Sequence, residues 1–126
     1  MKEAWSQEVV SLRDLAALAF EMRRPGYARA LLHEDSAMRA SMLKIGPGGC
    51  VPAHRHSNVH DHFFGIKGEL EIRCDGTRSL LAPGGYCCVP PRMTHDVRNL
   101  SEWHDAYCLL VHTGPGRFDF VEGDRP

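Results

Sequence analysis

Histidines and a carboxylate gather in one short stretch of this chain, between Gly48 and Gly68. Five candidate metal ligands fall within nine residues, namely His54, His56, His60, Asp61 and His62. Because side chains alternate along a β-strand, His54 and His56 lie on the same face and can aim at one point. Imidazole and carboxylate groups are ligands that Zn, Fe, Ni and Cu ions prefer. The stretch is therefore a candidate site for one of these divalent metal ions as cofactor.

The residues that follow bring a further ligand toward that point. Residues 57–58 can form a short turn, after which an antiparallel strand would place His60, Asp61 or His62 near the two histidines. A histidine-rich tract can also be a solvated loop. The apolar side chains of Phe63, Phe64 and Ile66 indicate burial, and they favour a metal site over such a loop.

A second stretch, from Gly84 to Asn99, completes a pair of motifs that resembles those of the cupin family. The family's first motif reads Gly, five residues, His-x-His, three or four residues, Glu, six residues and Gly. This chain has the same spacing over 48–68, but Asp61 stands where the family has glutamate.

The family's second motif reads Gly, five residues, Pro-x-Gly, two residues, His, three residues and Asn. Four residues of this chain fall in that register, namely Gly84, Pro90, His95 and Asn99. Arg92 stands where the family has glycine, which alters a turn. The resemblance spans a little under half of the chain, and it implies a fold and a metal pocket more specifically than a reaction.

In the family's arrangement, the His-x-His pair and the second-motif histidine point into the barrel. The resemblance thus implies that His54, His56 and His95 form a facial set that leaves coordination positions open to water or substrate. A further ligand comes from His60 or Asp61. Aspartate is shorter than glutamate by one C–C bond, roughly 1.5 Å, whereas imidazole reaches farther, so His60 is slightly preferred. Asp61 would then accept a hydrogen bond from an imidazole N–H.

The N-terminal segment has the pattern of a short helix. Leu12, Leu15, Ala19 and Met22 lie at helical spacing within 11–24. Pro25 and Gly26 then end the helix. We expect this helix to cover the sheet rather than to contribute to the site.

From Tyr27 onward, short period-two segments alternate with Gly, Pro and Asp turns, which predicts an all-β sandwich or barrel. Strands are expected at 27–33, 38–45, 61–66, 69–73, 78–81, 86–89, 95–99, 106–112 and 118–121. Asp75-Gly76 between two apolar runs predicts a tight hairpin. The resemblance implies the same class more specifically, as an antiparallel double-stranded β-helix, or jelly-roll barrel, forming a single cupin domain over 1–126.

Composition limits the class of protein. Fifteen Lys and Arg residues against sixteen Asp and Glu residues leave a net charge of -1, and the pI is about 6.7. This near-neutral charge does not indicate binding to nucleic acid or to an anionic membrane. No apolar run approaches the ~20 residues of a membrane span, and no signal peptide is visible, so we expect a cytoplasmic protein. Five cysteines without a C-x-x-C pair predict reduced thiols.

Other aromatic and histidine side chains are weaker candidates for the site. Tyr107 and His112 have opposite parity on the last long strand, so only one of them faces the cavity, and either is more often structural. His62 shares the parity of Phe64, and we expect it to face a dimer partner or a covering segment. Surface roles are expected for His33 and His104, and core or interface roles for Trp103, Phe118 and Phe120.

The resemblance and the motifs together favour a small metal-dependent enzyme. Similar cupins include quercetinase-like dioxygenases, sugar-acid isomerases and polyketide cyclases, which implies an oxygen-rich, aromatic or polyketide-like substrate. The alternative is a non-catalytic cupin that binds a metal or small molecule as a sensor or storage module. A sensor is usually fused to a helical DNA-binding domain, and residues 1–26 are too short for one. Small cupins also pair, so we expect a homodimer, and the sequence assigns no catalytic residue.

Overall fold

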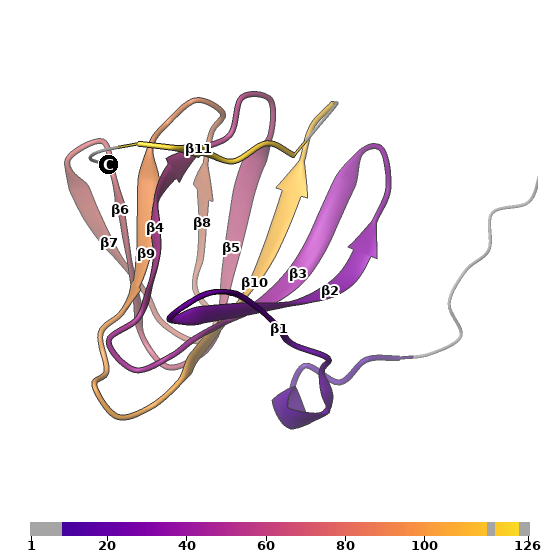
Figure 1. The fold of residues 1–126 in the computed structure, drawn as a ribbon, viewed down its shortest axis with the longest axis vertical. Helices are drawn as coiled ribbons and strands as arrows, with labels where there is room; N and C mark the ends of the chain where they lie inside the picture. Colours follow the sequence, from indigo (N-terminus) through magenta and orange to yellow (C-terminus); the bar gives the residue numbers. More distant parts are fainter. Residues whose placement is uncertain (1–8, 116–117, 124–126) are drawn as a thin grey trace, which may run out of the picture.

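Two antiparallel sheets face each other in the computed structural model, which describes residues 9–115 and 118–123 (Figure 1). One sheet has the strand order β1-β2-β3-β10-β5-β8, and the other has the order β11-β4-β9-β6-β7. The strands are β1 Glu21–Arg24, β2 Tyr27–Glu34, β3 Met38–Ile45, β4 Cys50–Arg55, β5 His60–Lys67, β6 Leu70–Cys74, β7 Thr77–Leu81, β8 Tyr86–Val89, β9 His95–Asn99, β10 Ala106–Thr113 and β11 Val121–Glu122. The predicted all-β double-stranded β-helix is confirmed.

The core lies between the sheets and follows the period of two. In β10 the buried residues are Ala106, Cys108, Leu110 and His112, with partly buried residues between them. Facing strands supply the rest of the cluster, including Leu43, Ile45, Val51, Phe63, Leu70, Ile72, Leu81, Val89 and Val97. His112 thus has the same inward parity as the core residues of β10, which places its ring inside the barrel.

The hairpin turn predicted at Asp75 and Gly76 takes its expected form, and the turn at Arg92, where we expected an alteration, is retained. Asp75 and Gly76 have φ angles of 52° and 71° between β6 and β7, as a two-residue hairpin with positive φ at both central positions requires. Arg92 has a φ of 68°, which is the left-handed region that glycine favours, and its backbone N–H donates to the carbonyl of His56 at 2.6 Å. An arginine therefore takes the conformation of the family's glycine, and the turn survives.

Asn99, the last residue of the second motif, has a structural role. Its side-chain amide donates to the carbonyls of Ile45 and His104 at 3.0 and 2.7 Å, and its oxygen accepts from the N–H of Ser101 at 2.9 Å. These bonds tie the end of β3 to the loop that connects β9 and β10. Asn99 therefore supports the barrel rather than the site.

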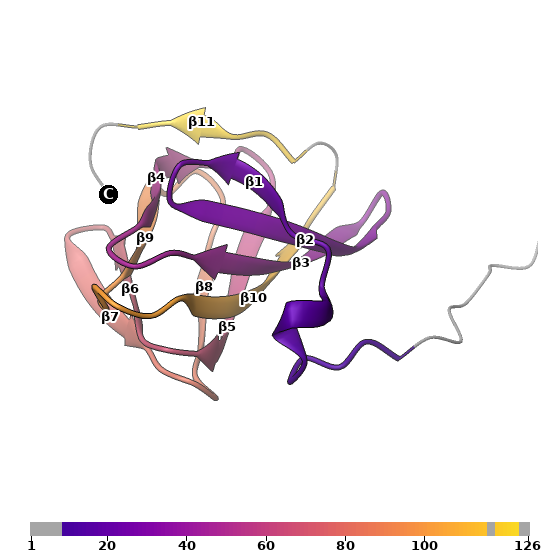
Figure 2. The same ribbon diagram turned by 60° about the horizontal axis from the view of Figure 1, so that its bottom comes forward.

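The predicted helix over 11–24 is wrong. A single 3-10 turn covers Leu15–Ala17, and Glu21–Arg24 pairs with β2 as an edge strand (Figure 2). Partly buried leucines recur every third residue at Leu12, Leu15 and Leu18, a spacing that suits a 3-10 turn. No helix within the described residues is long and apolar enough to cross a bilayer.

The edge strand β1 contains an irregularity. Its register with β2 shifts between Met22 and Arg24, so that Arg23 is an extra residue on this strand. Consecutive residues of a regular strand point to opposite faces, but a bulge can turn two neighbours toward the same side. The strand lies at the end of the barrel in Figure 2, next to β2.

The C-terminal strand β11 is an edge strand of the five-stranded sheet. β11 pairs with β4 through Val121 and Arg55 and through Glu122 and His54, and Figure 1 shows it running across the strand ends. The strand expected at 118–121 is thus shorter and shifted, because residues 118–120 carry no ladder pairing and instead lie against the site.

The outer face of β5 carries partly exposed aromatic groups. Phe63 is buried, whereas Phe64 points outward with its ring centroid 5.0 Å from that of Tyr86, an exposed residue of the edge strand β8. Phe63 thus lies on the inward side of β5 with Asp61, and Phe64 lies on the outward side with His62. The homodimer that we expect from the pairing of small cupins stays a prediction.

Close approach of two backbones at Gly65 gives a test of the barrel. Gly65 exchanges hydrogen bonds with Gly84 and Gly85, and a Cβ added at Gly65 would lie 2.0 Å from the carbonyl oxygen of Ala82. We expect Gly65→Ala to lower the free energy of unfolding by about 2 to 3 kcal/mol, since overpacking against backbone costs this much. Urea denaturation measures the change.

Gly46→Ala is the matched control, because a Cβ there meets nothing closer than 3.6 Å and φ is not positive. Equal stability of the two variants would contradict the close approach of β5 to the turn after β7.

Candidate metal centre

Three strands bring four donor groups together inside the barrel. The residues are His54 on β4, His56 directly after β4, Asp61 on β5 and His95 on β9, and their ligand atoms all lie within 4.8 Å of one another. His54 and His95 are register partners across β4 and β9. All four side chains are buried, with exposed fractions between 1% and 4%. The cluster is therefore a consequence of strand pairing and pleat parity.

Each of the three histidines is held by a main-chain carbonyl. The Nδ1 atom of His54 lies 2.7 Å from the oxygen of Pro52, that of His95 lies 2.9 Å from the oxygen of Met93, and that of His56 contacts the oxygen of Asp119. A carbonyl only accepts hydrogen bonds, so each Nδ1 must carry a proton and donate it. In the neutral rings, each Nε2 therefore presents a lone pair toward the cluster.

The carboxylate of Asp61 faces these lone pairs. Its Oδ2 lies 2.8 Å from Nε2 of His95 and 3.3 Å from Nε2 of His56. Neutral rings with protonated Nδ1 have no donor for this oxygen, so the arrangement needs either an added proton or a cation between the groups. Three imidazole nitrogens and one carboxylate oxygen fit a first-row divalent ion.

The pKa shifts of the metal-free chain reflect the same crowding. Burial would raise the pKa of Asp61, but its contacts with His56 and His95 outweigh burial and lower the pKa well below the usual range. Burial opposes protonation of His56, but the Asp61 carboxylate outweighs it and raises the pKa. Burial, with the neighbouring His95, lowers the pKa of His54 to about 4. A proton shared with Asp61 thus takes the position in which a metal ion would bind.

The preference for His60 over Asp61 is wrong. His60 is exposed on the outer face of β5, where its ring stacks near that of His62 with the centroids 6.2 Å apart. Asp61 is 1% exposed and points inward, together with Phe63 and Gly65, as pleat parity requires. The shorter carboxylate points inward from β5 and reaches the cluster, with its Oδ2 2.8 Å from Nε2 of His95.

His112 lies beside the cluster, although the sequence indicates it only as a weaker candidate. It is the register partner of Asp61 across β5 and β10, and its Nε2 lies 3.2 Å from Oδ1 of Asp61 without the alignment of a hydrogen bond. Burial lowers the pKa of His112 to about 3, so the ring is neutral at pH 7. Parity left His112 and Tyr107 as alternatives for the residue that faces the cavity. The register of His112 with Asp61 shows that His112 is that residue.

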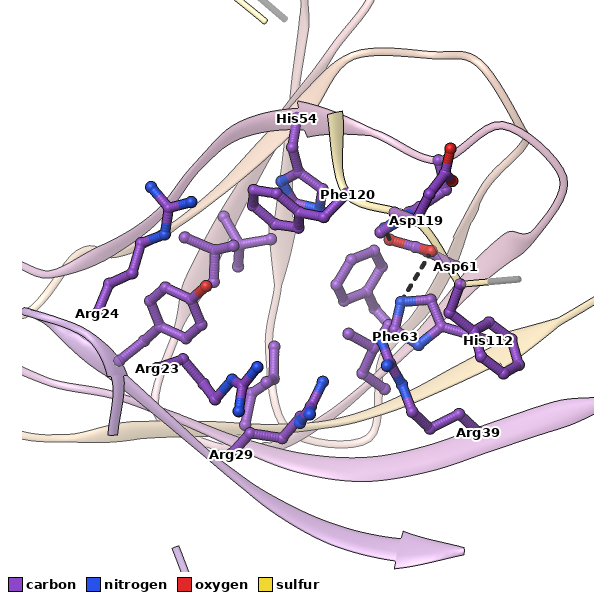
Figure 3. Close-up of a pocket in the computed structure, with 17 residues that line it drawn as sticks. Arg23, Arg24, Arg29, Arg39, His54, Asp61, Phe63, His112, Asp119 and Phe120 are labelled. Carbon is purple, nitrogen blue, oxygen red and sulfur yellow. Dashed lines mark hydrogen bonds and ion pairs between the residues drawn. The ribbon is translucent and has the colours of Figure 1, made fainter. Parts of the chain in front are cut away.

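A cavity of about 470 Å³ opens beside the cluster (Figure 3). Phe120 stacks on His54 with centroids 4.1 Å apart and planes 11° apart, and Phe118 lies 5.8 Å from the ring of His112. The residues that line the cavity include Tyr27, Leu43, Val51, Phe63, Val97 and Leu110. The expected core or interface role of Phe118 and Phe120 is therefore corrected, since both line this cavity.

The donor set and strand order agree with a comparison of the sequence to known families. Residues 41–112 match the family described as the cupin domain. The chain belongs to the cupin family. This match spans more than half of the chain and contains every member of the His54, His56, Asp61 and His95 cluster.

Several known proteins are similar to this cupin. Quercetin 2,3-dioxygenase of Bacillus subtilis (strain 168) is 35% identical over 57 residues, which are 45% of this chain and 17% of that protein. The structure of a conserved protein with a double-stranded β-helix domain from Klebsiella pneumoniae is similar, with a TM-score of 0.77 at 18% identity. The match covers 95% of this chain and 100% of that chain. KdgF from Halomonas sp. has a TM-score of 0.72 at 19% identity, covering 82% and 91%. The two structures show the fold alone.

The remaining candidates of the sequence lie outside the cluster. The ring of His62 is on the outer side of β5 and contacts the hydroxyls of Tyr86 and Thr113, each at 2.8 Å. His33 forms a surface pair with Asp35 at 2.8 Å, so its expected surface role is confirmed. Trp103 is 82% exposed. All five cysteines are free, and burial raises the pKa of the Cys108 thiol to about 12.

Adjacent residues on opposite faces of β5 give a sharp test of the metal centre. We expect Asp61→Asn to lose most of its metal, because the neutral amide removes the one charged ligand, and His60→Ala to retain one ion per chain. Elemental analysis after dialysis against a weak chelator measures both. Full metal content in Asp61→Asn, or in His95→Ala, would contradict the centre.

His112 should tune the centre without being required for it. We expect His112→Ala to weaken metal affinity by about 10- to 100-fold, since groups that orient a ligand have effects of this size. His112→Gln keeps an N–H near Asp61 and should recover much of the affinity. Competition with a fluorescent chelator measures this, with His62→Ala on the outer face as control. Unchanged affinity in His112→Ala would show that Asp61 is oriented without it.

Proposed function

We propose that this cupin is a metal-dependent enzyme that acts on a small aromatic or oxygen-rich molecule, with dioxygenase chemistry as the first candidate. One observation carries the proposal: three inward Nε2 lone pairs and the Asp61 carboxylate converge at the wall of a cavity large enough for a small organic molecule. A purely structural metal site would be closed by its protein ligands and would need no cavity.

The chain's own residues would hold the ion and position the substrate. His54, His56, Asp61 and His95 would be the ligands, and a first-row divalent ion bound there would supply Lewis acidity or a centre for dioxygen chemistry. Main-chain carbonyls fix the rings of the three histidines, so the ligand atoms need no rearrangement.

The walls of the cavity suit an aromatic substrate. Phe120 covers His54, and Phe63 and Phe118 contribute further ring surface beside the cluster. These rings exclude water from one side of the cluster and can stack on a flat molecule. The segment that carries Phe118 and Phe120 also carries the carbonyl that orients His56, so the same segment closes the cavity and positions a ligand.

The dioxygenase candidate is supported by one relative. The Bacillus protein named quercetin 2,3-dioxygenase is 35% identical to this chain over 57 residues, although the match covers only 17% of that protein. Cyclase and isomerase activities share the requirement for a metal beside an apolar cavity, and they are distinguished by whether dioxygen is consumed.

Metal analysis and oxygen uptake test the proposal together. Protein purified without an affinity tag should contain Fe, Ni or Cu, and it should consume dioxygen when small phenols or diketones are added. An oxygen electrode measures the rate. His54→Ala should abolish uptake together with metal content, whereas His60→Ala should retain both, because only His54 is within the cluster.

Tightly bound Zn without oxygen uptake, but with conversion of a substrate, would contradict the dioxygenase candidate and favour a cyclase or isomerase. A fully metal-loaded protein that converts none of these compounds, yet binds them, would contradict the enzyme and favour a binding module.

A further inference from the structure

Four arginines line the cavity, and three of them lie on the side away from Asp61 and His112. Arg23 and Arg24 come from β1, Arg29 from β2 and Arg39 from β3. Figure 3 shows Arg23, Arg24 and Arg29 on one side of the cavity and Asp61 with His112 on the other. Such a concentration of one charge is not predicted by the near-neutral composition of the whole chain.

Two of these guanidinium groups have no carboxylate partner within the described residues. Arg24 pairs with Glu122, and Arg39 lies 3.7 Å from Glu34 and over the ring of Phe118. Among residues 9–115 and 118–123, no carboxylate oxygen lies within ion-pair distance of Arg23 or Arg29. Their charges are therefore available to a ligand.

The acidic residues of the cavity do not neutralise this charge. Asp61 belongs to the metal cluster, and Asp119 is engaged by the backbone N–H and hydroxyl of Ser57 at 2.8 and 2.5 Å. Burial and the neighbouring Arg23 lower the pKa of Arg29, which shows that Arg29 is partly desolvated beside a like charge. Like charges in a partly buried site favour an anion between them.

Local backbone structure places these groups. The bulge in β1 makes Arg23 an extra residue, and both Arg23 and Arg24 line the cavity as a result. Arg29 shares strand parity with Tyr27, another lining residue. A planar guanidinium fork binds the two oxygens of a carboxylate or phosphate side by side.

We propose that Arg23 and Arg29 bind the oxyanion of the substrate, so that the cavity takes a small aromatic carboxylate or phosphate whose ring lies between the phenylalanines and the metal centre. This inference rests on the proposed function, because it names the substrate class of the same cavity. It adds a binding subsite made of two residues that neither motif contains.

Three probes of similar size test the oxyanion subsite. Benzoate, phenyl phosphate and benzyl alcohol are titrated into metal-loaded protein at constant ionic strength by calorimetry. We expect at least one oxyanion to bind about tenfold or more tightly than the alcohol, as charge-assisted bidentate bonds require. The tighter of the two distinguishes a carboxylate from a phosphate substrate.

Single arginine replacements assign the effect. Arg23→Gln and Arg29→Gln should each weaken oxyanion binding by about tenfold and leave binding of benzyl alcohol unchanged, because the amide keeps polarity without charge. Arg78→Gln is the matched control, since Arg78 is exposed on β7 and does not line the cavity. Equal binding of the three probes, or unchanged oxyanion binding in both cavity variants, would overturn the proposal.

Repeating the titrations on metal-free protein separates the two proposals. Oxyanion binding that disappears with the metal but persists in Arg23→Gln and Arg29→Gln would place the oxyanion on the ion, which overturns the arginine subsite and leaves the metal enzyme intact. Oxyanion binding that depends on the arginines in a protein without turnover would support the subsite while contradicting the enzyme.

Discussion

The donation of each histidine's Nδ1 proton to a main-chain carbonyl is the interaction on which the site depends. It fixes three ring orientations and directs three Nε2 atoms to one point beside Asp61. Buried polar groups are tolerated only when they are paired, and here the outer nitrogens are paired with backbone while the inner ones are left for a cation or a proton. The barrel therefore holds donor atoms in an arrangement that could bind a metal ion without rearrangement.

Strand register, the apolar core and the C-terminal segment together position the residues of this cluster. Register between β4 and β9 places His54 opposite His95, and register between β5 and β10 places Asp61 opposite His112. The apolar core fixes these registers, because a slip of one residue would exchange the buried and exposed faces of each strand. The C-terminal segment then adds the carbonyl of Asp119 and the ring of Phe120 from outside both motifs.

Much of this could be predicted from local patterns, and the failures have physical causes. Period-two spacing located β3, β8 and β9 with their observed bounds, and parity grouped His62 with Phe64 on one face of β5, which is the outward face. The choice between His60 and Asp61 failed because it rested on side-chain reach, whereas the pairing of β5 with β8 and β10 decides which of the two residues faces inward. The role of Asp119 depends on a contact between its carbonyl and the His56 ring, 63 residues away in sequence, and that of Phe120 depends on stacking on His54. No local pattern indicates either contact.

The position of the bulge separates two properties of the cavity. The candidate metal ligands lie on β5 and β9 and on or directly after β4, and all three strands are paired on both sides. Arg23 and Arg24 lie on β1, which within the described residues pairs with β2 alone. An insertion or deletion of one residue in an edge strand changes which side chains face inward without breaking a second ladder. Related sequences can thus alter the charge of the cavity by small length changes in β1 while the metal end of the barrel stays the same, so ligand preference can diverge faster than chemistry.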